Sequence, residues 1–135
     1  MDEQTQVNVR NWLKRAQENL RAAELEFNSE FYARAISTAY YAMFYAATGA
    51  LASIGIQRAK HSGVASAFGE HFVRSGKIGS EFGHMLRQTM EDREESDYAA
   101  VPVVDRTLAQ RHLDEARGFV SAVTQHLRQQ GLKTE

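Results

Sequence analysis

The chain has 135 residues, a formal net charge of −1, one proline and no cysteine. Its length suits a single domain over residues 1–135 that can bury its own core, and the missing cysteine excludes disulfides and thiolate metal sites. Because the charges nearly cancel, the protein has no overall positive field that would attract nucleic acid or a membrane surface. No run approaches the roughly 20 apolar residues that are needed to span a bilayer. We therefore expect a cytoplasmic protein.

The first expected helix covers about residues 7–27. Its apolar side chains alternate spacings of four and three, as the buried face of an amphipathic helix does, and Trp12 widens that face. They are Val9, Leu13, Ala16, Leu20, Ala23 and Phe27. Asn28 and Ser29 then supply a helix stop and an N-cap for the next helix. A connection this short favours antiparallel neighbours.

The central expected helix runs from Phe31 to Ser53 and carries a stripe of very small side chains. The stripe follows the same alternation and consists of Ala35, Ala39, Ala42, Ala46 and Gly49. Another helix can approach such a stripe unusually closely. We therefore expect the rest of the chain to be organised around this helix.

A second stripe on the central helix carries hydroxyls, aromatic rings and a guanidinium group. Its members are Arg34, Ser37 or Thr38, Tyr41 and Tyr45, at positions where a plain surface helix shows glutamate and lysine. One interpretation is that the tyrosines are half-buried packing residues with wet hydroxyls. The other is that this face lines a cleft or a subunit interface.

Gly55 ends the central helix, and the loop at 57–61 holds the densest positive charge. A shorter helix is expected over residues 62–74, with Ser62 as its N-cap. A fourth helix starts at Ser80, which we expect to cap it, and ends near Ser96.

The only proline, Pro102, indicates a loop or a break between Ser96 and Asp105. Asp105 is a good N-cap for a long last helix, and Gly131 is placed to end it. The sequence therefore predicts an all-α fold, an up-and-down antiparallel four-helix bundle plus a short extra helix.

A second unusual stretch, EDREESDY, places Arg93 among five carboxylates. On a helix, Arg93 and Asp97 are four residues apart and can pair, while the other acids face water. The acidic excess also lies near a helix C-terminus, where the helix dipole disfavours anions. Either this is a solvated helix end with a tethered arginine, or something other than helix stability places the acids there.

Familiar enzyme signatures are missing from the sequence. The five histidines are scattered, and no two lie one helical turn apart as a two-histidine metal site requires, so we expect no metal. Neither a glycine-rich phosphate loop nor a serine-centred nucleophile motif is present. We expect no cofactor.

Three stretches together resemble the HEPN family of small helical bundles. They are YARAISTAYYAMFYAATGALASIGI, KHSGVASAFGEHFVRSGKI and LRQTMEDREESDY. The sequence is similar to prokaryotic HEPN proteins that are encoded beside a minimal nucleotidyltransferase. This resemblance implies a helical bundle that dimerises, a two-component toxin and antitoxin type module with a nucleotidyltransferase partner, and in active members a metal-independent ribonuclease site.

The ribonuclease site of the family is an arginine followed after four to six residues by a histidine. Arg93 occupies the matching place, but the residue five positions on is Tyr98, preceded by Asp97, and no histidine follows nearby. Arg106 and His112 have the spacing but lie in the last helix, which is the wrong element. A tyrosine with a pKa near 10 is a poor proton shuttle at neutral pH, and the local carboxylates repel RNA.

Three hypotheses follow. In the first, a homodimer partners a nucleotidyltransferase and binds a nucleotide or RNA in a cleft lined by Arg34, Tyr41, Tyr45, Arg93, Asp97 and Tyr98. In the second, the chain is a ribonuclease toxin in which Arg93 stabilises phosphate charge and Tyr98, His61 or another residue replaces the missing base. In the third, it is a dimeric scaffold without a ligand. The resemblance also marks Tyr98 as a candidate acceptor of a nucleotidyl group.

Overall fold

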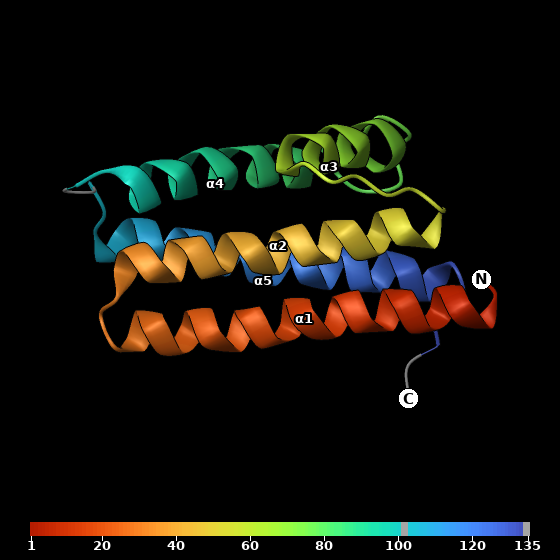
Figure 1. Ribbon diagram of the computed structural model, residues 1–135, viewed down its shortest axis with the longest axis horizontal. Helices are drawn as coiled ribbons and strands as arrows, with labels where there is room; N and C mark the ends of the chain where they lie inside the picture. Colours follow the sequence, from red (N-terminus) through yellow and green to blue (C-terminus); the bar gives the residue numbers. More distant parts are fainter. Residues whose placement is uncertain (101–102, 134–135) are drawn as a thin grey trace.

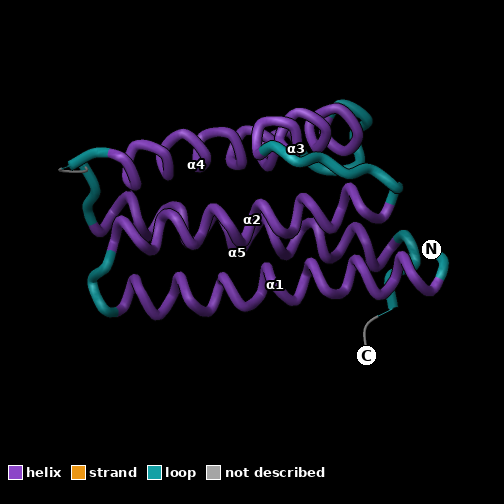
Figure 2. The backbone as a smooth tube through the Cα atoms, viewed as in Figure 1, coloured by secondary structure: helices purple, strands orange, loops and turns teal. Residues whose placement is uncertain are grey.

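The computed structural model describes residues 1–100 and 103–133. Within them the chain is all-α and forms an antiparallel bundle (Figures 1 and 2). Its helices are α1 (Glu3–Asn28), α2 (Tyr32–Ser53), α3 (His61–Phe68), α4 (Ser80–Tyr98) and α5 (Arg106–Gln129), and a π-helical turn, η1 (Gly69–Val73), continues α3. The predicted fold class, four long helices and a short one, is confirmed. None of the helices in the described part of the chain is long and apolar enough to cross a membrane.

Helix α2 lies at the centre of the bundle, between α1 on one side and α4 with α3 on the other (Figure 1), and it also packs against α5. The small-residue stripe is buried along its whole length. At Gly49, an added Cβ would lie 3.1 Å from the Cβ of Trp12 and 3.7 Å from the Val9 carbonyl oxygen. The stripe therefore faces α1, and the backbones approach more closely there than a larger side chain would permit.

Several helix starts differ from the predicted caps. Ser29 is the C-cap of α1, and Glu30 then turns the chain at φ 66° before α2 begins without a side-chain cap. Ser62 and Ser80 also do not cap, because α3 begins at His61 and Ser80 is itself the first residue of α4. A serine can occupy the first turn as readily as the cap, so residue type alone does not fix the register.

The end of α4 and the start of α5 flank the loop that contains Pro102, which lies outside the described residues. Helix α4 continues two residues past the predicted end at Ser96, to Tyr98. Asp105 is the N-cap of α5 as predicted, since its Oδ1 accepts a 2.8 Å hydrogen bond from the Leu108 amide. Gly131 ends α5 at φ 104°, a conformation that favours glycine.

We predict that Ala42→Leu destabilises the protein by roughly 1–3 kcal/mol, because Ala42 is fully buried in the stripe that approaches α1 and the extra methylenes overpack it. Ala22→Leu, on the exposed face of α1, is the matched control and should change the free energy of unfolding by less than about 0.5 kcal/mol. Urea denaturation of both variants measures the difference. Equal midpoints would show that the stripe is not tightly packed.

Candidate functional site

Arg93 is a buried cation, 9% exposed, on the inner face of α4. Its Nη1 donates to Asp97 Oδ2 at 3.2 Å, one turn further along the same helix. The same Oδ2 accepts a 3.3 Å hydrogen bond from the Ser37 hydroxyl of α2. Asp97 thus joins α4 to α2 and offsets the buried charge, as a desolvated guanidinium requires.

Two aromatic rings of α2 complete the surroundings of Arg93. Its guanidinium carbon lies 5.3 Å from the ring centre of Tyr40 and 5.7 Å from that of Tyr41. At these distances the negative faces of the rings attract the cation. The Nε of Arg93 is buried and has no hydrogen-bond partner among the described residues, so one donor of this group is left unused.

His61, the first residue of α3, contacts the same two tyrosines. Its Nδ1 lies 2.9 Å from the Tyr40 hydroxyl, and its ring stacks on Phe44 with centres 4.3 Å apart and meets Tyr41 edge to face. Arginine and histidine, which the sequence places 32 positions apart, therefore contact one tyrosine pair. We call Ser37, Tyr40, Tyr41, His61, Arg93 and Asp97 the Arg93 cluster.

The cluster favours a neutral imidazole. Burial lowers the pKa of His61 and the nearby Arg93 charge lowers it further, while Glu94 acts in the opposite direction. Burial also raises the pKa of Tyr40, so its hydroxyl stays protonated. That hydroxyl can donate to Nδ1 or accept from it, depending on the tautomer, and Nε2 is left for a ligand.

Of the predicted ligand-binding residues, the structure brings together Tyr41, Arg93 and Asp97, and the ring of Tyr45 packs beside Tyr41 with centres 5.9 Å apart. The polar contacts of Tyr45 and Arg34 are made with α1 instead. Tyr45 stacks on Trp12 with ring centres 5.8 Å apart, and its hydroxyl accepts a 3.0 Å hydrogen bond from Arg15. Arg34, with a side chain 79% exposed, pairs with Glu26 at 3.7 Å. Arg34 shares a helical face with Ser37 and Tyr41, but its guanidinium pairs with α1 rather than with the cluster.

Tyr98, the candidate for catalysis and modification, is the last residue of α4 and is 80% exposed. The described residues show neither a ring contact nor a hydrogen bond between Tyr98 and the Arg93 cluster. Its hydroxyl is therefore accessible to a second protein but does not act beside Arg93 in this conformation.

Three cluster residues, Ser37, Tyr40 and His61, lie outside the ligand-binding residues that the sequence predicts. Ser37 belongs to the predicted polar stripe, and His61 is a candidate replacement base in the ribonuclease hypothesis. Tyr40 could have been found, because it shares a helical face with Ser37, Tyr41 and Phe44 at spacings of three and four. His61 carries no such signal, since only the fold of the loop before α3 brings it to α2.

The Arg106 and His112 pair, which matched the motif spacing, is structural. Arg106 lies over the ring of Phe27 at 4.8 Å, whereas His112 is fully buried. The Nε2 of His112 lies 2.7 Å from Asp92 Oδ2, and its Nδ1 lies 3.2 Å from the Thr89 hydroxyl. These contacts join α5 to α4. Among the described residues, no three histidine, aspartate or glutamate side chains gather as metal ligands.

The model of the HEPN domain matches residues 9–127, so the chain belongs to the HEPN domain family. A "UPF0332 protein" from Thermotoga maritima is 32% identical over 91% of this chain and 92% of its own length. Two Methanocaldococcus jannaschii proteins are also similar. "Putative toxin MJ0142" is 30% identical over 85% of this chain and 78% of its own, and "Putative toxin MJ0605" is 32% identical over 84% of each.

The crystal structure of TT1696 from Thermus thermophilus has the same fold. It superposes with a TM-score of 0.72 over 88% of this chain and 98% of its own, at 22% sequence identity. The helical arrangement of this chain is therefore one that a solved protein adopts.

We predict that the pKa of His61 rises in Arg93→Gln and falls in Glu94→Gln, because these charges act on the imidazole with opposite sign. NMR titration of the imidazole protons measures both shifts. Since the folded pKa lies below the unfolded value near 6.5, the contribution of neutral His61 to stability is complete above pH 6.5 and is lost as the pH falls through the folded pKa. Unchanged titration in both variants would show that neither charge reaches His61.

Proposed function

We propose that the protein is the HEPN component of a two-gene module of toxin and antitoxin type. In this proposal it works as a homodimer beside a nucleotidyltransferase partner, and its Arg93 cluster binds a phosphate group of a nucleotide or of RNA. Family membership and two relatives that are named as toxins support the module. The single observation that carries the binding role is the desolvated guanidinium of Arg93 with its unused Nε donor.

The local chemistry suits a phosphate more than a neutral ligand. A buried charge is screened less than a surface charge, so the attraction of Arg93 for an anion is stronger than its single charge would give in water. Asp97 engages only Nη1 in the structure, and the Ser37 hydroxyl and His61 Nε2 provide further polar contacts close by. The two acids next to Arg93 on its C-terminal side, Glu94 and Glu95, are exposed to water and are therefore better screened.

Tyr98 fits the role of the modified residue because of its exposure. In that role its hydroxyl oxygen attacks the α-phosphate of ATP, a phosphodiester bond forms, pyrophosphate leaves and the phenolic proton passes to solvent. The nucleotidyltransferase supplies the catalysis, so Tyr98 needs access to a partner more than it needs neighbours of its own.

We predict that the chain co-purifies with the nucleotidyltransferase encoded beside it and gains the mass of a nucleotidyl group when the two are incubated with ATP. Intact mass spectrometry should show this gain in the wild type and in Tyr45→Phe, whose hydroxyl is occupied by Arg15, but not in Tyr98→Phe. A gain that survives Tyr98→Phe would place the acceptor elsewhere. A chain that stays alone in the presence of its cognate partner would contradict the module.

A second function, metal-independent cleavage of RNA, is favoured by the position of His61. The imidazole reaches the surroundings of Arg93 from α3 and is neutral near pH 7, as a general base should be. Arg93 would stabilise negative charge on the phosphate in the transition state. His61 would then take the role of the missing histidine of α4, because the fold brings it close to Arg93 although the two are distant in the sequence.

For this second function we predict RNA cleavage by the purified protein in the presence of a chelator. Arg93→Gln and His61→Asn should each lower the rate by on the order of a hundredfold, since each removes a group that acts on the reacting phosphate. His84→Asn, which removes an exposed histidine of α4, is the matched control and should keep the wild-type rate. Intact RNA at high protein concentration would eliminate cleavage and leave the binding role.

A further inference from the structure

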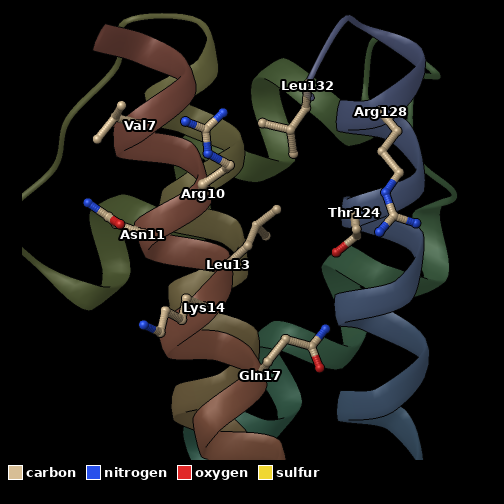
Figure 3. Close-up of a pocket in the computed structure, with 9 residues that line it drawn as sticks. All are labelled: Val7, Arg10, Asn11, Leu13, Lys14, Gln17, Thr124, Arg128 and Leu132. Carbon is tan, nitrogen blue, oxygen red and sulfur yellow. The ribbon is translucent and has the colours of Figure 1, made fainter. Parts of the chain in front are cut away.

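A groove of about 640 Å³ lies between α1 and α5 (Figure 3), and its lining shares no residue with the Arg93 cluster. Its floor is apolar and includes Leu13 and Leu132, which are 8% and 5% exposed. Figure 3 shows Gln17 extending from α1 toward the space between the helices, with Arg10 on α1 and Arg128 on α5 at its sides. The groove is large enough for a small ligand.

The groove concentrates positive charge. Arg10, Lys14 and Arg128 line it, and no carboxylate of the described residues does. Within the same part of the chain, neither Lys14 nor Arg128 forms an ion pair, and Arg10 donates to the Lys133 carbonyl oxygen at 3.3 Å. Arg93, between other helices, has an acidic partner in Asp97. Arg128 can bind a phosphate through two donors, and Lys14 adds a second positive charge from the opposite helix.

A buried hydroxyl points independently to a ligand. Thr124 lines the groove from α5, and its Oγ1 is inaccessible to solvent and has no hydrogen-bond partner among the described residues. A helical threonine can bond the carbonyl four residues back, and Thr48 does so with Phe44 at 2.8 Å. Thr124 instead keeps its hydroxyl unpaired one turn before Arg128. A phosphate oxygen between the walls would accept from it.

The closed end of the groove is held rigidly. The side chain of Gln6 donates to the Gly131 carbonyl at 2.7 Å and accepts from the Lys133 amide at 2.9 Å. The Leu132 amide bonds the Leu127 carbonyl at 2.9 Å, which satisfies part of the end of α5. The segment after α5 is therefore fastened to α1, and a ligand meets walls that are already ordered.

The other end of the groove limits the length of the ligand. A second hollow continues from Gln17, Thr124 and Arg128 along α5 to Arg117. Arg117 is paired with Glu24 at 3.4 Å and with Asp114 at 3.2 Å. Because Arg117 already has two carboxylate partners, the cations of the groove and this hollow without an ion pair in the described part of the chain are Lys14 and Arg128, and this short cationic part suits a compact anion.

We propose that the groove between α1 and α5 is a binding site for a short phosphate chain, held by Arg10, Lys14, Arg128 and Thr124. Because no aromatic ring of the described residues lines the groove, no base is stacked there, and the phosphates themselves are recognised. Inorganic polyphosphate and the phosphate tail of a nucleotide present the same chemistry. The site is separate from the Arg93 cluster and does not depend on the function proposed for it.

Isothermal titration of the full chain with tripolyphosphate, ATP, adenosine and an eight-nucleotide RNA tests the site. Tripolyphosphate and ATP should bind with similar affinity, which falls as salt increases, and adenosine should not bind. Tighter binding of tripolyphosphate than of ATP would identify inorganic polyphosphate as the ligand. Tighter binding of ATP would identify a nucleotide as the ligand. Adenosine binding as tightly as ATP, or RNA binding more tightly than either anion, would overturn the proposal.

Variants assign the binding to the groove. Arg128→Gln should weaken tripolyphosphate binding roughly tenfold, the loss expected for one charge-assisted contact, and Arg10→Gln combined with it should weaken binding further. Thr124→Val removes only the hydroxyl and should also weaken binding. Arg21→Gln, an exposed residue of α1 outside the lining, is the control, and Arg93→Gln separates the two sites. Arg21→Gln should retain wild-type affinity. Arg93→Gln removes the other proposed phosphate site, so in that background Arg128→Gln should still weaken the binding that remains, and unchanged affinity in Arg128→Gln would refute the groove site.

Discussion

The close approach of α1 to α2 is the constraint on which the rest of the bundle depends. It requires a backbone without a side chain at Gly49, where the Trp12 Cβ leaves 3.1 Å to an added Cβ, and alanines along the remaining contact. Small residues bury little apolar area each, so stability here comes from dense packing over a long contact. With its small face committed to α1, α2 presents its aromatic face to α3 and α4.

That aromatic face determines the chemistry of the Arg93 cluster. Tyr40 and Tyr41 exclude water from one side of the guanidinium, and Phe44 does so for the imidazole of His61. Desolvation alone would disfavour both charged forms, so Arg93 needs Asp97, whereas His61 becomes neutral. One surface thus holds a permanent cation and a neutral base side by side. In water, the charge of Arg93 would be more strongly screened, and burial would not keep His61 neutral.

Periodicity predicted the helices because each buried face repeats within one element, and it predicted the Arg93 and Asp97 pair because four residues make one turn. It failed where two elements had to be placed relative to each other. Arg34 and Tyr45 share a stripe with Tyr41 along the axis, yet one reaches Glu26 and the other Trp12, both on α1. His61 joined the cluster through the path of a loop, which spacing does not encode. The predicted N-caps at Ser29, Ser62 and Ser80 were wrong, because serine tolerates several positions near a helix end.

The Arg93 cluster and the groove between α1 and α5 differ in how their positive charge is balanced. This difference separates the roles that we propose for them. Arg93 is buried and already offset by a carboxylate, so a ligand there must fit a fixed geometry and compete for one guanidinium. The groove cations Lys14 and Arg128 are exposed and have no carboxylate partner in the described part of the chain, so an anion there gains from several charges at once but is sensitive to salt. Because a charge in solution is felt over only about 8 Å at physiological salt, the acids of α4 do not cancel the field of the groove across the bundle. Under these two proposals, a chain of nearly zero net charge attracts one anion at the groove and holds another at the Arg93 cluster.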